Sequence, residues 1–233
     1  MARVKVAVNT VLLLLAAVPD TKAVIRVHRA RYKSGGANIT IEQFCPQRSI
    51  GQSPAILLLH GLGGVTSPHF PYYKEARALA ELGYCVYLPR YLDAAHAPGQ
   101  YPKWVQAILD AVEYTGARRI GLIGYSLGAS VALATAAADP RFGAVVALSG
   151  SLPDEYFGLL TTLPPLLVIH GQDDRTVSVS NASNLALLCQ TGNFVCDVQI
   201  YPREGHEFSA SALAKAQGQI EKFLERYLPV RPD

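Results

Sequence analysis

Two kinds of hydrophobic pattern follow each other along the chain. Residues 24–32 and 37–44 alternate apolar and polar side chains around a glycine-containing turn, which predicts an antiparallel hairpin with one face in water. Beyond the hairpin, the apolar residues form short continuous runs. Such runs are typical of parallel strands that are buried on both faces, and they lie at residues 55–61, 84–90, 119–124, 144–150 and 165–171.

Helix-length segments separate several of these runs, at residues 71–83, 101–116 and 126–140. This alternation predicts a mostly parallel sheet with helices on both faces. Residues 212–228 repeat apolar side chains at helical spacing, so we expect a last helix that packs one face on the sheet. We find no internal repeat and no linker, so one α/β domain should cover residues 24–233.

The first residues have the order of a secretory signal. Arg3 and Lys5 precede an apolar segment over residues 6–18, which a proline and small residues follow up to Ala23. We therefore predict a signal peptide over residues 1–23 and a secreted or periplasmic protein with no membrane attachment after cleavage. The alternative for this segment is a buried strand or helix.

The composition favours a small-molecule partner. The 233 residues are 50% hydrophobic and 17% charged, which is enough for one large hydrophobic core. The 21 Lys and Arg residues nearly balance the 18 Asp and Glu residues, and no dense basic cluster is present, so we expect no nucleic-acid partner. None of these patterns determines the oligomeric state.

The four cysteines form an even set that suits an oxidising compartment. Cys189 and Cys196 flank a Gly-Asn turn between a helix end and a strand start, which could bring their Cα atoms within bridging range, so we favour this pair. Cys45 and Cys85 would then form the second pair, although two buried free thiols remain the alternative. No pair has the spacing of zinc ligands, so we expect no metal site.

A candidate nucleophile lies where a predicted strand meets a predicted helix. Residues 124–128 read Gly-Tyr-Ser-Leu-Gly and match the G-x-S-x-G pattern, in which a sharp turn exposes the serine. The helix start offers unpaired N–H groups to a developing negative charge. Ser126 is therefore the candidate nucleophile, and the alternative is a helix-capping serine in a glycine-rich turn.

A serine nucleophile needs a general base and a carboxylate that orients the base. His206 follows the strand predicted near residues 197–202 and is the one histidine that lies after the candidate acids in the chain. Asp173 and Asp174 follow the run 165–171, at the edge of the sheet where α/β sites form. The residues themselves do not decide between these two aspartates, and Asp154 is a third candidate.

An acyl-transfer site also needs hydrogen-bond donors for an oxyanion. The N–H group of Leu127, directly after the candidate nucleophile, should be one donor. The glycine-rich loop after residues 55–61 should provide the other, with Leu62 as the first candidate and Gly63 as the second. An ordinary glycine-rich turn is the alternative for this loop.

Together these motifs resemble the α/β-hydrolase superfamily and, more narrowly, its dienelactone hydrolase-like branch, from about Ile39 onward. The resemblance implies an α/β-hydrolase fold, and the family pattern G-x-x-D-x-x-V places the acid on Asp174. Dienelactone hydrolases proper use a cysteine nucleophile, whereas this chain has Ser126. The resemblance also puts Tyr91 and His96 near the site, without a role for either.

The function that we expect is a serine hydrolase that cleaves carboxylic esters or lactones of small substrates through an acyl-enzyme, with no cofactor. Ser126, Asp174 and His206 would form its catalytic triad, and the N–H groups of Leu127 and Leu62 its oxyanion hole. The short connection between residues 150 and 166 is too short for a large lid domain, so the pocket should be open. The alternatives are a peptidase, an acyltransferase or a non-catalytic binding protein.

Overall fold

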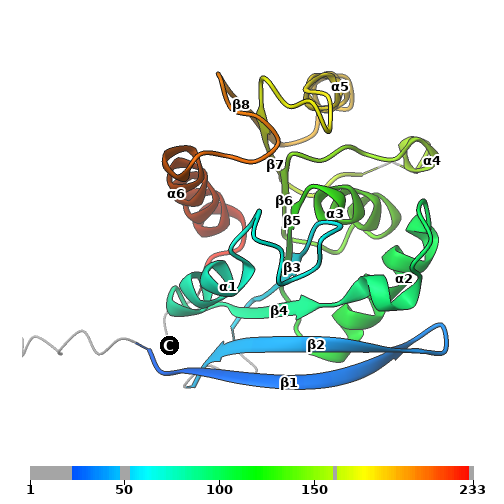
Figure 1. The fold of residues 1–233 in the computed structure, drawn as a ribbon, viewed down its shortest axis with the longest axis vertical. Coiled ribbons are helices and arrows are strands. Elements are labelled where there is room, and N and C mark those ends of the chain that lie inside the picture. The colour runs from blue at the N-terminus through cyan, green and yellow to red at the C-terminus, as the bar shows by residue number, and fades with distance from the viewer. Residues whose placement is uncertain (1–22, 48–52, 160–161, 231–233) are drawn as a thin grey trace, which may run out of the picture.

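The computed structural model describes residues 23–47, 53–159 and 162–230 (Figure 1). The signal peptide predicted over residues 1–23 therefore lies, except for Ala23, outside the described residues. The described chain forms one eight-stranded sheet. Its strands are β1 (Ile25–Ser34), β2 (Ala37–Pro46), β3 (Ala55–Leu59), β4 (Cys85–Pro89), β5 (Ile120–Tyr125), β6 (Ala144–Leu148), β7 (Leu166–Gly171) and β8 (Cys196–Tyr201).

The strand order in the sheet is β1-β2-β4-β3-β5-β6-β7-β8. The strands β3 to β8 pair in parallel, whereas β1 and β2 form the predicted antiparallel hairpin, and β2 joins the rest of the sheet antiparallel to β4. The prediction of a mostly parallel sheet with an N-terminal hairpin is confirmed. The central strands are buried at every residue, as their continuous apolar runs predict.

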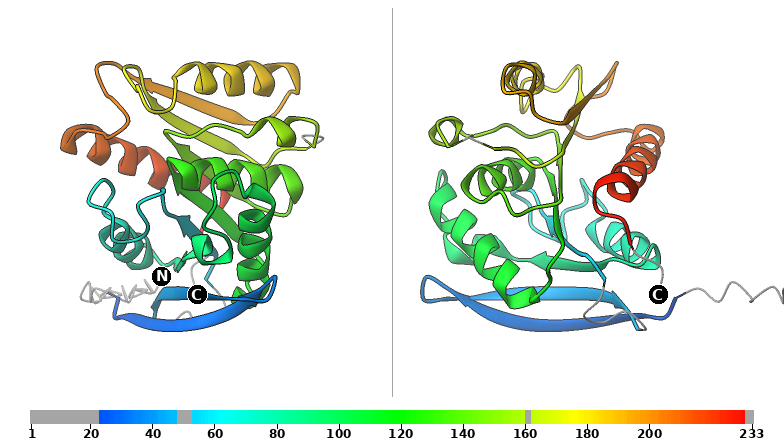
Figure 2. Two further views of the ribbon diagram at one scale, coloured as in Figure 1. Left: turned by 45° about the vertical axis from the view of Figure 1, so that its right-hand side comes forward. Right: turned by 180° about the vertical axis from the view of Figure 1, so that it is seen from behind.

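Helices cover both faces of this sheet (Figures 1 and 2). The helices α1 (Tyr72–Glu81) and α6 (Ala210–Tyr227) enclose one hydrophobic core, while α2 (Tyr101–Thr115), α3 (Leu127–Ala138) and α5 (Ser180–Thr191) enclose the other. No helix among the described residues has the length and apolar character that a membrane crossing requires.

The structure gives bounds to the helix that the sequence places before the Gly-Asn turn, and it adds two short helical segments. The helix α5 precedes β8, and two very short helical segments follow β4 and β6, namely the 3₁₀ helix η1 (Tyr91–Ala94) and α4 (Asp154–Phe157). The hydrophobic periodicity of these two segments is too short to mark them in the sequence. Between β6 and β7, α4 is the one helical element among the described residues, so this connection holds no large lid domain.

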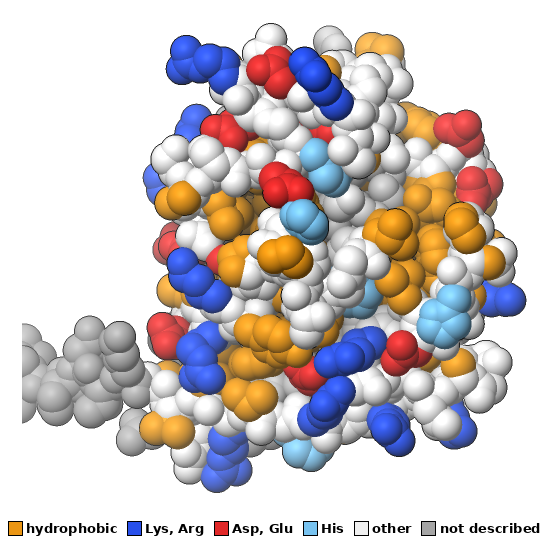
Figure 3. All heavy atoms as spheres, in the orientation of Figure 1, with side chains coloured by type: hydrophobic (Ala, Val, Ile, Leu, Met, Phe, Trp, Pro, Cys, Tyr) orange, Lys and Arg blue, Asp and Glu red, His pale blue; other side chains and the backbone are white. Residues whose placement is uncertain are grey.

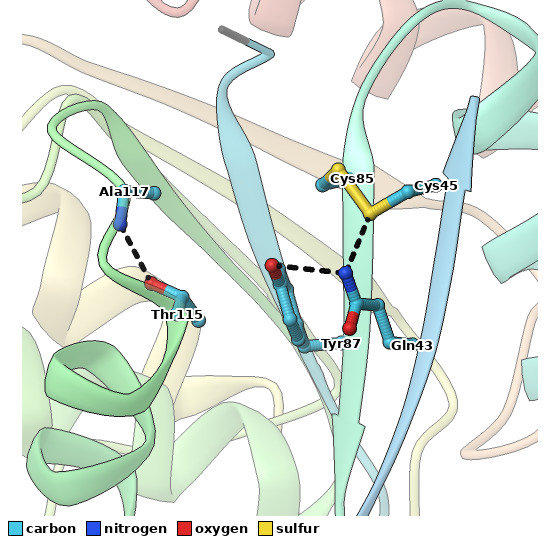
Figure 4. The surroundings of a disulfide bond; sticks show 6 residues. All are labelled: Gln43, Cys45, Cys85, Tyr87, Thr115 and Ala117. Atoms are coloured by element: carbon cyan, nitrogen blue, oxygen red, sulfur yellow. Dashed lines mark hydrogen bonds between the residues drawn. A yellow bond between two sulfur atoms is a disulfide. The ribbon is translucent and has the colours of Figure 1, made fainter. Parts of the chain in front are cut away.

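Both expected disulfide bonds are present. Cys45 lies next to the β2–β4 register pair Phe44–Val86, so that it faces Cys85 across the two antiparallel strands, with 4.3 Å between the Cα atoms (Figure 4). Cys189, near the end of α5, joins Cys196 at the start of β8. The first bond links the N-terminal hairpin to the parallel strands. The second links α5 to β8, the strand at the other edge of the sheet.

The two disulfide bonds should contribute unequally to stability. Cys45 and Cys85 are 40 residues apart, whereas Cys189 and Cys196 are 7 residues apart, so the first bond removes more entropy from the unfolded chain. We predict that replacing Cys45 and Cys85 by alanine lowers the free energy of unfolding by about 4 kcal/mol, and replacing the other pair by about 2 kcal/mol. Guanidinium unfolding without reductant measures both values, and an equal or reversed order would contradict the prediction.

Candidate active site

Loops from four strands meet at the carboxyl edge of the sheet. The loop with Leu62 follows β3, Ser126 follows β5, Asp174 follows β7 and His206 follows β8. Because β3 and β5 are neighbours, the glycine-rich loop lies beside Ser126. Parallel strands all end on the same side, so residues far apart in the chain converge there.

Ser126 occupies a strained turn between β5 and α3. Its φ of 56° and ψ of −124° lie outside the regions that L-residues favour, and its N–H group donates to the Leu148 carbonyl at 2.8 Å. The turn is tight enough that a Cβ atom on Gly124 would overlap the Gly128 carbonyl, and one on Gly128 would overlap the Leu59 carbonyl. Both glycines of the motif are therefore required by close backbone contacts.

Ser126, His206 and Asp174 form a continuous hydrogen-bonded chain. The Ser126 Oγ donates to His206 Nε2 at 2.9 Å, and His206 Nδ1 donates to Asp174 Oδ2 at 2.9 Å. The Asp174 side chain is fully buried, whereas the His206 side chain is 17% exposed. The structure therefore brings the three predicted residues together in the geometry of a nucleophile, a base and an orienting acid.

The environment of Asp174 keeps its carboxylate charged. Burial raises its pKa, but hydrogen bonds from His206 and from the N–H groups of Val177 and Thr176 outweigh burial, so the net pKa is lowered. The other two candidate acids lie elsewhere. The Asp173 side chain is exposed, and Asp154 is exposed at the start of α4.

A second histidine contacts the same carboxylate. The buried His170 Nε2 lies 2.9 Å from the Val177 carbonyl oxygen and 3.2 Å from Asp174 Oδ2. A proton on His170 Nε2 lies between the Val177 carbonyl oxygen and Asp174 Oδ2. His170 therefore links the Asp174 carboxylate to the backbone of the turn that follows Asp174. The sequence indicates a histidine bonded to the backbone at this position, but not its contact with Asp174.

The two predicted oxyanion donors have unused N–H groups. Leu127 is the first residue of α3, so its N–H has no acceptor within the helix. Among the described residues, neither this N–H nor that of Leu62 donates a hydrogen bond. Both residues line the cavity that contains Ser126.

Two buried tyrosines form hydrogen bonds with the backbone directly before Leu62. Tyr72 Oη accepts a hydrogen bond from the Gly61 N–H at 2.7 Å, and Tyr91 Oη donates to the His60 carbonyl at 2.5 Å. The His60 ring stacks on Tyr91, and burial lowers the pKa of His60 to about 4, so the ring is neutral near pH 7. Tyr91 therefore lies close to the site, as expected, but supports the loop rather than lining the cavity.

Two further side chains hold the backbone of His206. Tyr125 Oη donates to the His206 carbonyl at 3.1 Å, and Ser149 Oγ donates to the same oxygen at 3.3 Å. Ser149 is fully buried and has a φ of 50°. Neither contact can be predicted from the sequence, because nothing in the local pattern indicates that these strand ends meet the loop after β8.

A cavity of about 540 Å³ opens beside Ser126. His96 lines this cavity, as the sequence analysis allows, together with residues of η1, α2 and α3. Figure 3 shows hydrophobic side chains gathered on the surface between α2 and α4, at the right of the view. Among the described residues, no group of three or more His, Cys, Asp or Glu side chains is placed to hold a metal ion.

The fold and the convergence of these loops define an α/β-hydrolase. The model of the dienelactone hydrolase family matches residues 103–223, which is more than half of the chain. The chain therefore belongs to the dienelactone hydrolase family, whose members are hydrolases that act on ester bonds. No curated protein sequence matches the chain.

Solved structures share the fold at low sequence identity. A candidate dienelactone hydrolase from Klebsiella pneumoniae superposes with a TM-score of 0.78 at 16% identity, covering 88% of this chain and 100% of its own. The dienelactone hydrolase from Anabaena variabilis has a TM-score of 0.72 at 19% identity, covering 89% and 99%. The dienelactone hydrolase-like promiscuous phosphotriesterase P91, from metagenomic libraries, has a TM-score of 0.77 at 17% identity, covering 87% and 98%.

The close contact of Gly128 with β3 generates a testable prediction. A methyl group at this position would overlap backbone atoms that cannot move independently, so Gly128→Ala should lower the free energy of unfolding by about 1–3 kcal/mol. Gly218→Ala in α6 is the matched control, because its Cβ meets no atom within 4 Å and alanine favours a helix by about 1 kcal/mol. Denaturant unfolding of both variants measures the difference, and a Gly128→Ala protein as stable as the unmodified chain would contradict the prediction.

The lowered pKa of Asp174 generates a second prediction, on the pH dependence of stability. Because the folded pKa is below the ordinary value of an aspartate, the carboxylate stabilises the fold above that ordinary value, and this contribution is lost as the pH falls through the folded pKa. Asp174→Asn should therefore reduce the free energy of unfolding most at pH 6 and progressively less towards pH values of about 2–3.

The matched control for this second prediction is Asp173→Asn, which removes an exposed carboxylate next in the chain. Its difference from the unmodified protein should stay nearly constant over the same pH range. Urea unfolding from pH 2 to pH 6 measures both variants. A pH-independent difference for Asp174→Asn would show that the folded state does not stabilise the charged form.

Proposed function

We propose that this protein is a serine hydrolase that cleaves carboxylic esters, lactones included, of small substrates through an acyl-enzyme. The observation that carries the proposal is the hydrogen-bonded chain from Ser126 through His206 to Asp174, with the serine hydroxyl at a cavity. Membership of the dienelactone hydrolase family supports the ester bond as the target.

In the first half of the proposed reaction, Ser126 Oγ attacks the carbonyl carbon of the ester while His206 Nε2 takes the hydroxyl proton. The carbonyl oxygen becomes an oxyanion and accepts hydrogen bonds from the N–H groups of Leu127 and Leu62. The carbon–oxygen bond to the alcohol then breaks, and the alcohol leaves with the proton from His206. The acyl group remains on Ser126.

In the second half, His206 Nε2 takes a proton from a water molecule that attacks the acyl-serine. The same N–H groups hold the second oxyanion, and its collapse releases the carboxylic acid as Ser126 recovers its proton from His206. Asp174 accepts the hydrogen bond from His206 Nδ1 throughout, which keeps Nε2 free to accept and stabilises the charged imidazolium.

Export from the cytoplasm is part of the same proposal. The charged and apolar order of residues 1–23 favours a signal peptide. The disulfide bonds Cys45–Cys85 and Cys189–Cys196 support an oxidising compartment, because such bonds persist outside the cytosol. We therefore propose that the mature chain works as a secreted or periplasmic enzyme.

Replacing Ser126 tests the proposed nucleophile. Ser126→Ala should lower kcat for p-nitrophenyl acetate by about 10⁴-fold or more, because the chain then lacks the attacking oxygen. It should also lose labelling by a fluorophosphonate probe. Ser178→Ala, which removes an exposed hydroxyl, is the matched control and should keep both properties.

Hydrolysis by Ser126→Ala at the unmodified rate would overturn the assignment. The same assay should include a short peptide and a phosphotriester, because one structural neighbour is described as a promiscuous phosphotriesterase. Serine-dependent cleavage of the peptide with esters untouched would replace the proposed reaction by peptide hydrolysis.

A further inference from the structure

The position of His206 relative to the cavity indicates on which side of Ser126 the acyl group of an ester would lie. Ser126 and the two proposed oxyanion donors, Leu62 and Leu127, line the cavity, whereas His206 does not line it within the described part of the chain. The alcohol must leave on the side of His206, because it takes its proton from that ring. The acyl chain therefore extends to the other side of Ser126, into the cavity.

The walls of this cavity are mainly apolar. Leu92 comes from η1, Pro98 from the loop after it, Trp104 from α2, and Val177 from the loop after β7. The Trp104 side chain is fixed by a hydrogen bond within the protein, because its Nε1 donates to the Ala95 carbonyl at 2.9 Å. An apolar chain would gain free energy here by leaving water, and it would meet a surface that is already formed.

Apart from the exposed His96 and the indole of Trp104, the polar side chains that line the cavity carry hydroxyl groups. None of the lining residues is Lys, Arg, Asp or Glu. Ser130 lies one helical turn after Ser126, and its Oγ accepts a hydrogen bond from the Ser151 N–H at 3.1 Å, with the Ser151 hydroxyl 3.5 Å away. Burial raises the pKa of Tyr101, so its phenol stays neutral. A carboxylate in this cavity would lose water without gaining a cationic partner.

We propose that the substrate is an ester whose acyl group is apolar and uncharged, and that the cavity between η1, α2 and α3 binds this acyl group and rejects anionic acyl chains. This inference rests on the proposed function, since it requires Ser126 to attack the ester. Leu92, Pro98 and Trp104 would contact the chain, and the hydroxyl groups of Ser130 and Ser151 would meet its far end.

The test compares two adipate esters that differ by one methyl group. Methyl p-nitrophenyl adipate is neutral, whereas mono-p-nitrophenyl adipate carries a carboxylate at the end of the same acyl chain. At pH 8, kcat/KM of the full chain should be higher for the neutral ester by about tenfold or more. A ratio near one, or in favour of the anion, would overturn the proposal.

A variant that adds a cation to the cavity tests the cause of the selectivity. His96 is exposed at the rim, so His96→Arg should fold, and it should raise kcat/KM for the anionic ester relative to the neutral one. His96→Gln controls for loss of the imidazole. Gln190→Arg, which adds the same charge on α5 outside the cavity, should leave the ratio unchanged. Equal effects of the two arginines would contradict a local cause.

Chain length gives an independent readout. In a series of p-nitrophenyl esters, kcat/KM should rise by about fourfold for each added methylene of the acyl chain until the cavity is filled. Acetate esters of increasingly long alcohols should show no such rise. A rise confined to the alcohol series would overturn the placement of the acyl group.

Ser126→Ala separates failure of this inference from failure of the proposed function. If Ser126→Ala abolishes cleavage of both adipate esters and the unmodified protein does not prefer the neutral one, the substrate class is wrong and the serine hydrolase assignment stands. If Ser126→Ala cleaves both esters at the unmodified rate, the proposed function fails, and the inference fails with it.

Discussion

The site depends on the close approach of the first turn of α3 to the ends of β3 and β5. Gly124 and Gly128 allow the backbones to meet, and their contact forces Ser126 into a conformation that L-residues rarely adopt. The strain is sustained because buried strands and a buried helix surround the turn. The same approach puts the N–H group of Leu127 beside the loop that carries Leu62, so one packing constraint positions both the hydroxyl group and the proposed oxyanion donors.

A second layer of polar contacts fixes the hydrogen-bonded chain of Ser126, His206 and Asp174. Asp174 receives hydrogen bonds from two backbone N–H groups and from His206, and His170 lies against the same carboxylate. Tyr125 and Ser149 donate to the carbonyl of His206. Because Asp174, Tyr125 and Ser149 come from the ends of three different strands, they restrain the histidine ring and its backbone before a substrate binds.

The cavity beside Ser126 and the hydrogen-bonded chain of Ser126, His206 and Asp174 differ in polarity. In the proposed reaction, Asp174 and the transient imidazolium of His206 lie on the side where the alcohol leaves, while the N–H groups of Leu127 and Leu62 hold the oxyanion. The acyl side has apolar walls and neutral hydroxyl groups. This separation keeps the orienting charge away from the part of the pocket that would bind a water-excluding chain.

The hydrophobic pattern predicted the fold class, and the order of serine, acid and histidine predicted most of the candidate triad. Continuous apolar runs are typical of strands buried on both faces. Ser126 and Asp174 each follow such a run, whereas His206 follows the partly exposed strand β8. For the acid, the residues alone left Asp173 and Asp154 open, and only the family pattern favoured Asp174. What the tertiary structure decided is which atoms meet: the hydrogen-bonded chain through the Asp174 carboxylate, the contact of His170 with it, the support of His206 by Tyr125 and Ser149, and the absence of His206 from the described cavity lining. Such contacts join residues tens of positions apart through side-chain directions, which hydrophobic periodicity does not encode.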